Sequence, residues 1–315
     1  MAKKHYSKPP LSFQEQIQTW IDRGLQVPDQ YRAQSYLSHI SYYRLSAYCI
    51  PFQDKKDKFN KGTTFNDVLN LYIFDRELRL LILDAIERIE IGLRTQIIYQ
   101  LAHKYGSHWQ DDASLFKPPY TNRRGIVIDP FIQLQNFLQK EYRSSDPEVF
   151  IKHYFDNYTS PANPPSWMAM ELITIGGLSR LYSNLAKNED KKLIAENYKL
   201  PHFIFQSWFH AITHLRNLCA HHCRIWNREY RIVPQILKKP RYNWIEPKFN
   251  INNRTFYYLH ILKYFLNIIN PSNTFQSKLE ALLNTHSNVD IRFLGLPTDK
   301  KKQLMDWKSQ PLWKK

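Results

Sequence analysis

The sequence predicts an all-α protein, and three observations support this fold class. Apolar residues recur at three- and four-residue steps over residues 64–104, where no proline interrupts the pattern. Only 8 of the 315 residues are glycine, which leaves few positions for the tight turns of sheet proteins. No segment sustains the alternation of apolar and polar residues that predicts a half-buried strand. We therefore expect a helical bundle.

Residues 1–60 are expected to form a helical N-terminal extension. Ser12 followed by Glu15 has the spacing of a capping box, which predicts that a helix begins there. Residues 30–50 carry apolar and aromatic side chains at helical spacing, whereas the charged run at residues 54–58 predicts a surface loop.

A helical core is predicted over residues 61–230. It contains the long helix 64–104, whose polar-face charges are expected to form mainly surface pairs. Proline-containing turns then mark an insertion at about residues 107–165, with short helical runs near 131–142 and 148–157.

The core continues with a helix from Ser166 to about Leu185, which we expect to be interrupted at Gly176–Gly177. A short helix over residues 190–198 precedes a helix over residues 203–226, and we expect the latter to pack against the long helix.

The C-terminal region, residues 231–315, is predicted to be basic, aromatic and helical. Its helices are expected over Thr255–Ile269 and after Pro271.

The charge of the chain indicates an anionic partner. Lys and Arg number 44 against 28 Asp and Glu, so the net charge is +16. Binding to RNA through such a surface should weaken as the salt concentration rises. Neither GxGxxG nor GxxxxGK[ST] occurs, and we expect no small-molecule cofactor.

The three cysteines are too few for a disulfide framework, and their odd number would leave one thiol unpaired in a secreted protein. The basic N-terminus precedes no apolar segment of a signal peptide, and charges interrupt the most apolar stretches. We expect a cytoplasmic protein that does not enter a membrane.

Residues 210–229 hold four His, two Cys and three Arg, too many polar groups for a core segment. One interpretation is metal binding, because several possible ligands are spaced for one helix face or one turn. They are His210, His214 and His221 on one face, with Cys219 and Cys223 one turn apart. Zinc sites usually draw ligands from two elements, and no second ligand cluster occurs in the sequence. We therefore expect no metal.

The other interpretation is metal-free cleavage of a phosphodiester by Arg216 and His221. RNA supplies its own nucleophile in the 2′-OH, so an imidazole that accepts the proton and a guanidinium that neutralises the phosphate are sufficient. Residues five apart lie about 140° apart around an ideal helix. Either the helix is distorted near Ala220, or two copies of the motif meet in a homodimer.

Several sequence blocks in a fixed order resemble abortive infection proteins of the AbiD/AbiF type over roughly residues 35–230. The blocks are Ile40-Ser41-Tyr42-Tyr43-Arg44-Leu45-Ser46, Leu71-Tyr72-Ile73-Phe74-Asp75-Arg76-Glu77-Leu78-Arg79, Glu87-Arg88-Ile89-Glu90-Ile91-Gly92-Leu93-Arg94-Thr95, Trp167 with Glu171, and Arg216-Asn217-Leu218-Cys219-Ala220-His221-His222 followed by Arg224-Ile225-Trp226-Asn227-Arg228. Such proteins are similar to the HEPN superfamily, whose members are helical and typically dimeric RNases.

The resemblance implies that Arg216 and His221 are the catalytic pair of a metal-independent endoribonuclease and that Asn217 orients them. His222 is a second imidazole that could act instead of His221. The resemblance also implies antiviral defence and association with a small non-coding RNA. Cleavage by the 2′-OH would leave 2′,3′-cyclic phosphate ends.

Other charged residues have two possible roles each. Glu87, Glu90 and Arg94 could position Arg216 from the facing helix, or they could be surface charges.

Arg224 and Arg228 suit contacts with RNA phosphates, or they are solvated arginines. Trp167 and Glu171 are expected to serve packing and a helix-to-helix hydrogen bond.

The leading functional hypothesis is an RNA-cleaving toxin that acts in defence against phage. The alternative is a non-catalytic RNA-binding platform in a complex with a non-coding RNA. A zinc hydrolase is a third possibility, but the chain has no HExxH motif.

Overall fold

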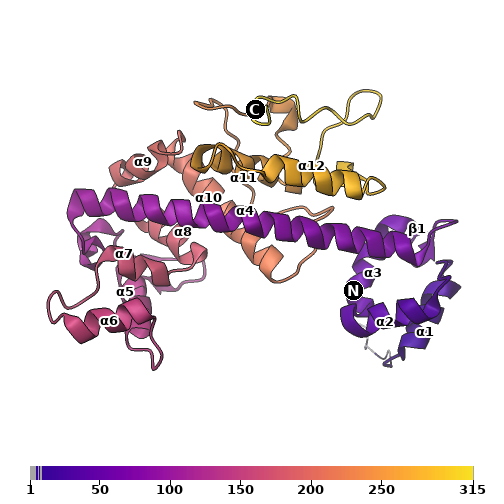
Figure 1. Ribbon diagram of the computed structural model, residues 1–315, viewed down its shortest axis with the longest axis horizontal. Helices are drawn as coiled ribbons and strands as arrows, with labels where there is room; N and C mark the ends of the chain where they lie inside the picture. Colours follow the sequence, from indigo (N-terminus) through magenta and orange to yellow (C-terminus); the bar gives the residue numbers. More distant parts are fainter. Residues whose placement is uncertain (1–4, 6, 8, 315) are drawn as a thin grey trace. The chain divides into compact units, whose positions relative to one another are not determined.

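The computed structural model describes residues 5, 7 and 9–314, and it is mostly helical (Figure 1). Helices hold 58% of the residues and strands 6%, which confirms the predicted all-α class. The chain forms two compact units. The first comprises the described residues up to Leu78 together with Glu280–Asp290, and the second comprises Arg79–Leu279 with the remaining C-terminal residues. None of the described helices is both long and apolar enough to cross a membrane.

The first unit is built from short helices and one hairpin. Its elements are α1 (Phe13–Asp22), α2 (Gln30–Ile40), α3 (Tyr42–Cys49), the 3₁₀ turn η1 (Ile50–Phe52), β1 (Gln53–Lys55), β2 (Lys58–Phe59), the beginning of α4 (Phe65–Tyr105) and the end of α12 (Phe275–Thr285). The capping box predicted at the start of α1 is confirmed. The Ser12 Oγ accepts from the Glu15 N–H at 3.3 Å, and the Glu15 carboxylate accepts from the Ser12 N–H at 2.6 Å.

Two features of the first unit were not predicted. Residues 30–50 form two helices, because Ser41 adopts φ 72° and ends α2 while its Oγ accepts from the Arg44 N–H and caps α3. The charged run at 54–58, predicted as a surface loop, belongs to the antiparallel pair β1–β2, in which Gln53 pairs with Phe59.

Buried polar contacts hold the first unit together beside its apolar core. The Tyr48 hydroxyl donates to Asp75, a fully buried carboxylate on α4, at 2.7 Å. Just beyond the end of α12, the ring nitrogens of His286 lie 2.9 Å from Asn70 Oδ1 and 3.0 Å from Glu77 Oε2. The first contact joins α3 to α4, and the contacts of His286 attach the separate C-terminal segment of the unit to α4.

The long predicted helix is confirmed as α4, a single helix of 41 residues (Figure 1). At its start, the Thr64 Oγ1 accepts from the Asp67 N–H and the Asp67 carboxylate accepts from the Thr64 N–H. At its end, Gly106 adopts φ +95°, a conformation that glycine takes without steric cost. Local caps thus fix both ends of the helix.

The second unit contains the remaining elements. After the larger part of α4 they are η2 (Trp109–Asp111), η3 (Ala113–Leu115), β3 (Tyr120–Thr121), β4 (Val127–Ile128), α5 (Pro130–Tyr142), α6 (Val149–Asn157), α7 (Ser166–Ala169), η4 (Met170–Leu172), α8 (Ile175–Asn184), α9 (Asn188–Glu196), α10 (His202–Ala220), η5 (Pro247–Phe249), α11 (Thr255–Ile269), the beginning of α12 and η6 (Ile291–Leu294). The helices predicted near 131–142, 148–157 and 255–269 agree with α5, α6 and α11. The hairpin β3–β4 was not predicted.

The core of the second unit surrounds α11, in which every residue from Thr255 to Leu266 is buried. Helix α10 packs chiefly against α8, α9 and α11. Aromatic rings fill the α10–α11 interface, with Trp208 edge-on to Tyr264 at 5.3 Å and Phe205 edge-on to Phe265 at 6.0 Å. This packing fixes the helix that carries the motif.

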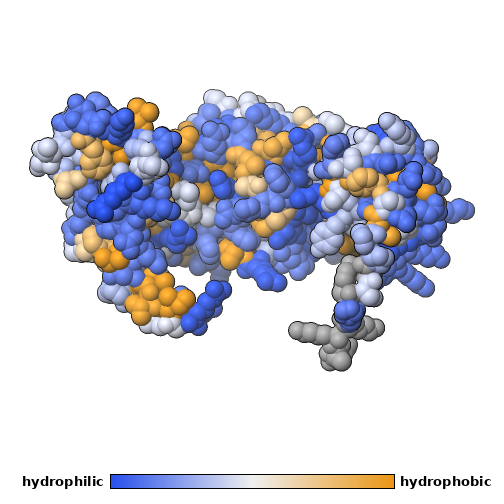
Figure 2. All heavy atoms as spheres, turned by 90° about the horizontal axis from the view of Figure 1, so that it is seen from below, coloured by the Kyte–Doolittle hydropathy of each residue, from blue (hydrophilic) through white to orange (hydrophobic). Residues whose placement is uncertain are grey.

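One face of the molecule is predominantly hydrophilic. Figure 2 shows hydrophilic residues over most of one face, with apolar residues in separate patches among them. Single exposed apolar side chains such as Tyr31, Tyr43 and Val149 are ordinary on a protein surface.

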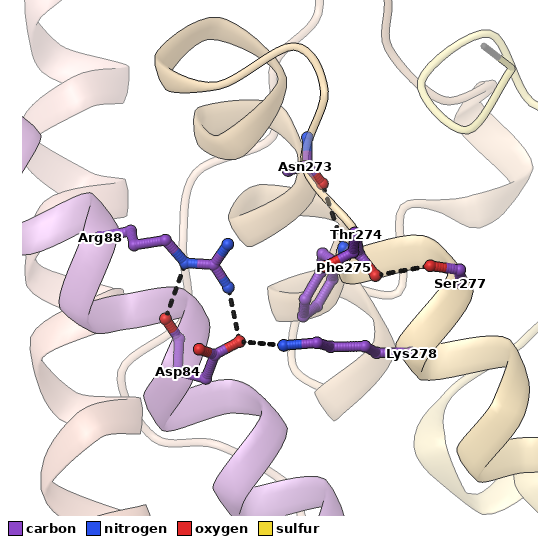
Figure 3. A network of polar contacts seen from close by, with 7 residues as sticks. All are labelled: Asp84, Arg88, Asn273, Thr274, Phe275, Ser277 and Lys278. Carbon is purple, nitrogen blue, oxygen red and sulfur yellow. Dashed lines mark hydrogen bonds and ion pairs between the residues drawn. The ribbon is translucent and has the colours of Figure 1, made fainter.

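A polar network joins α4 to the start of α12 within the second unit (Figure 3). Asp84 Oδ2 accepts from Arg88 Nη2 at 2.5 Å and from Lys278 Nζ at 3.2 Å. Asn273 caps α12 by accepting from the Phe275 N–H at 3.3 Å. These charges are half-exposed, so each pair adds little stability, and of these contacts only Asp84–Lys278 joins the two helices.

The predicted interruption at Gly176–Gly177 is wrong by a few residues. The break falls at Ile173, and Thr174 then caps α8 by accepting from the Gly177 N–H at 3.3 Å. Both glycines therefore lie in the first turn of a helix. They differ in their surroundings, because a Cβ on Gly177 would lie 2.3 Å from Ile173 Cγ2, whereas one on Gly176 would lie 3.5 Å from Thr213 Cγ2.

We expect Gly177→Ala to lower the free energy of unfolding by about 1–3 kcal/mol, because the new methyl group must displace the buried Ile173 side chain. Gly176→Ala is the matched control, since its methyl group makes an ordinary contact, and its change should stay within about 0.5 kcal/mol. Urea unfolding of both variants measures the difference. Equal stability of the two variants would contradict the tight packing at Ile173.

Candidate functional site

The C-terminus of α10 exposes two adjacent histidines. The helix ends at Ala220, and His221 is its C-cap residue with φ −88°. His222 follows with φ 56°, and the N–H groups of His222 and Cys223 donate to the carbonyls of Cys219 and Leu218 at 3.0 and 2.9 Å. This pair of bonds is a Schellman motif, here with histidine at the position usually taken by glycine. The helix predicted to reach residue 226 therefore stops six residues earlier, and both imidazoles are exposed.

Arg216 and His221 point to different sides of α10. Phe203, His210, Asn217 and His221 lie within one exposed stripe, whereas Arg216 is half-buried at the edge of the packed face. The α-helix continues without interruption from His202 to Ala220. A helical geometry keeps the side-chain directions of Arg216 and His221 about 140° apart.

The only hydrogen bond of the Arg216 guanidinium in the described part of the chain is a long one of 3.5 Å from Nη1 to Asn217 Oδ1. Of the two alternatives, a helix distorted near Ala220 is not observed, because α10 is regular up to that residue. Within one chain, the two predicted catalytic groups do not converge.

The loop that follows the histidines is fixed by buried contacts. The Arg79 guanidinium of α4, only 4% exposed, donates to the Cys223 carbonyl at 3.4 Å. The Thr255 hydroxyl at the start of α11 donates to the Ile225 carbonyl at 2.7 Å, and the buried Trp226 ring packs on Phe293 at 5.0 Å. The histidines therefore lie between a rigid helix and an anchored loop.

Arg79 and Asp75 were not predicted as buried residues. Both were expected among the surface charges of the long helix, but they are 4% and 0% exposed. Asp75 lies four residues after Leu71 and three before Leu78, and Arg79 lies three residues before Ile82, which places both on the apolar face. That spacing was the signal for burial.

Arg224 and Arg228 lie on the same loop and are half-buried. Arg228 Nη1 donates to the Arg224 carbonyl at 3.0 Å, and its guanidinium lies 6.0 Å from the Tyr230 ring centre.

Burial lowers the pKa of His214 below its usual range, and the nearby charges of Arg228 and His210 lower it further. His214 is therefore neutral at pH 7.

Two of the supporting residues, Glu90 and Arg94, have other partners than Arg216. Arg94, whose side chain is 13% exposed, donates to Glu90 at 3.0 Å, to Glu171 at 3.1 Å and to the Ile173 carbonyl at 2.8 Å. Among the described residues, no contact joins this cluster to Arg216. Its contacts instead attach α4 to the segment containing α7 and η4.

Glu87 is exposed and takes no part in this cluster, as expected of a surface charge. The predicted helix-to-helix hydrogen bond of Glu171 is confirmed by Arg94. The packing role predicted for Trp167 is wrong, because its side chain is 51% exposed.

The sulfur and imidazole groups of the motif do not assemble into a ligand cluster. Cys219 is buried, and Cys223 Sγ contacts the carbonyl oxygen of His221 at 3.9 Å. Within the described residues, no three His, Cys, Asp or Glu side chains are grouped so that they could hold a metal ion.

Comparison with known proteins gives one match. The sequence model of a family described as Abi-like protein matches residues 35–227, which is more than half of the chain and includes the segment from Arg216 to His222. No curated protein and no solved structure matches the chain.

Proposed function

The chain belongs to the Abi-like protein family, and from this premise we propose that it acts in abortive infection as a metal-independent endoribonuclease of the HEPN type. Abortive infection is a defence against phage. In this proposal the protein works in the cytoplasm on cellular or phage RNA, and a small non-coding RNA associates with it.

The proposed reaction uses the nucleophile within RNA. His221 accepts the proton of a 2′-OH as its oxygen attacks the adjoining phosphorus, and the bond from phosphorus to the 5′-oxygen breaks. A protonated imidazole, from His221 or His222, returns a proton to the departing 5′-oxygen. Arg216 neutralises the charge that develops on the pentacovalent phosphate, and Asn217 orients the pair. The products are a 2′,3′-cyclic phosphate and a 5′-OH end.

The observation that best supports this chemistry is the exposure of His221 at an anchored helix end. A histidine kept for packing would be buried, as His260 is on α11, where burial lowers the pKa to about 3. His221 instead faces solvent beside a loop that carries Arg224 and Arg228. Exposed imidazoles and cations in this arrangement suit a phosphodiester substrate.

A homodimer would complete the site. One chain holds Arg216 and His221 about 140° apart on a regular helix, so a second copy is needed to bring an arginine and a histidine to one phosphate.

The separation of Arg216 and His221 also favours one alternative, a non-catalytic RNA-binding platform. In that case the net charge of +16 would serve RNA binding alone.

Incubation of the purified protein with single-stranded RNA tests the proposal. We expect cleavage in the presence of excess EDTA, products with 2′,3′-cyclic phosphate ends, and no cleavage of a DNA or 2′-deoxy-substituted strand, because these lack the nucleophile. Cleavage that EDTA abolishes would contradict the metal-independent mechanism. RNA binding without cleavage or growth arrest during infection would support the platform instead.

A further inference from the structure

A cavity of about 690 Å³ lies in the second unit, away from the motif. Its walls come from the hairpin β3–β4, α5 and α8, which are segments far apart in the sequence. This volume falls in the range of small-ligand pockets. The proposed cleavage reaction involves none of the residues that line this cavity.

Aromatic rings form part of the cavity wall. Phe116 is buried and packs on Phe131 with ring centres 5.8 Å apart, so its position is fixed. Phe137 of α5 is half-buried, and Tyr120 of β3 is 44% exposed. Of the three rings, Tyr120 is the most exposed, and an exposed aromatic ring is a stacking surface for nucleobases of any sequence.

Amide side chains complete the wall. The side chains of Gln133 and Asn184 make no hydrogen bond within the described part of the chain, and both line the cavity. An amide offers a donor pair and an acceptor, which match the edge of a nucleobase. The wall therefore combines stacking surfaces with groups that can hydrogen-bond a flat polar ring.

Arg180 connects this cavity to a second one. It is exposed, it has no ion-pair partner among the described residues, and it lines both the first cavity and a cleft of about 380 Å³. The cleft lies over the N-terminal half of α10 and includes His202 and His210. No Asp or Glu is among the residues that line either space, and the nearby Glu189 acts on His202 of the cleft.

A buried lysine beside these walls adds positive charge. Lys191 is 3% exposed, and its Nζ donates to the carbonyl of Ser183, a residue that lines both spaces. Burial, together with the neighbouring Lys117, lowers the pKa of Lys191 to about 8. A phosphate nearby would relieve this repulsion.

We propose that the first cavity holds one base of a single-stranded RNA, with the Arg180 guanidinium on the adjoining phosphate and the strand continuing through the cleft along α10 toward His221. His210 and His221 are eleven residues apart, about 16 Å along the helix, which is a span of a few nucleotides. The direction of the strand depends on the proposed function, whereas the proposal of a base pocket depends only on the residues that line the cavity.

The test measures binding of a short fluorescent single-stranded RNA to the full chain in a His221→Ala background, which prevents cleavage during the measurement. We expect Tyr120→Ala and Arg180→Ala each to weaken binding by about tenfold, because each removes a stacking surface or a phosphate contact. Tyr120→Phe keeps the ring and should bind as the parent protein does.

Two matched controls remove the same side chains elsewhere on the second unit. Tyr99→Ala removes an exposed tyrosine of α4, and Arg143→Ala removes an exposed arginine at the far end of α5. Neither residue lines the cavity, and neither variant should change the affinity by more than about twofold.

Photo-crosslinking gives an independent readout. RNA that carries thiouridine should crosslink to Tyr120, Phe116 or Phe137, as identified by mass spectrometry of the digested protein. Unchanged affinity of the Tyr120 and Arg180 variants, with crosslinks elsewhere, would overturn the base pocket. Competition by adenosine monophosphate without binding of the RNA would also overturn it, because the site would then take a free nucleotide.

The outcomes separate this inference from the proposed ribonuclease. If the wild-type protein cleaves no RNA but the cavity variants lose affinity, the base pocket stands and the proposed activity fails. If cleavage depends on His221 but the cavity variants bind normally, the activity stands and the base pocket fails.

Discussion

Replacing His221 by alanine is expected to lower the rate of RNA cleavage by about 10²- to 10⁴-fold, the usual loss when a general acid or base is removed. RNA affinity should change by less than about twofold, because one imidazole adds little to binding driven by many phosphate contacts. The variant should fold, since the bonds that end α10 are made by the backbone. Single-turnover cleavage and fluorescence anisotropy measure the two quantities.

Two further histidine variants show whether the loss of activity is specific to His221. His39→Ala removes an exposed histidine of α2 in the first unit and should retain full activity. His222→Asn removes the second imidazole, and asparagine tolerates the positive φ at that position. A large loss in His222→Asn with normal activity in His221→Ala would transfer the proton-transfer role to His222. Full activity of both single variants would contradict proton transfer by either residue alone.

A dimer that combines one Arg216→Ala chain with one His221→Ala chain is expected to recover about half of the wild-type activity, although each variant alone is nearly inactive. If each site takes its arginine from one chain and its histidine from the other, the mixed dimer has one intact site and one doubly mutated site. The angle of about 140° between the two residues on α10 is the reason to expect this arrangement.

Co-expression of the two variants with different tags, followed by purification on both tags, isolates the mixed dimer. A dimer of two Arg216→Ala chains, prepared in the same way, is the control and should stay inactive. Recovery of a doubly tagged species without activity would show that each site lies within one chain. Failure to recover any doubly tagged species would contradict the homodimer.

Local signals in the sequence were sufficient for most helices. The capping box at Ser12 and the reciprocal cap at Thr64 act between residues three apart, so sequence spacing alone reveals them. The end of α10 was not predictable in this way. Nothing in the sequence distinguishes His222 as a residue that adopts φ 56°, because glycine is the usual signal for such a helix end.

The candidate site was predictable only in part. His221 is exposed, as a residue that contacts RNA must be. The sequence left open whether a distorted helix or a homodimer brings His221 to Arg216. The cavity next to Arg180 was not predicted, because Phe116, Tyr120 and Phe137 come from separate segments of the insertion. Hydrophobic periodicity predicts single helices and strands, and it does not indicate which of them lie side by side in the folded chain.

The first unit consists of two segments that are far apart in the sequence, so during translation it cannot be completed until the second segment has been synthesised. That unit needs Glu280–Asp290, where His286 contacts Asn70 and Glu77, and the motif loop needs Phe293 against Trp226. A ribosome adds about 5–20 residues per second, so these partners emerge several seconds after the motif has been synthesised. Until then a nascent chain lacks the Phe293 contact of the histidine loop, and under the proposed ribonuclease function we expect it to spare the messenger RNA from which it is being made.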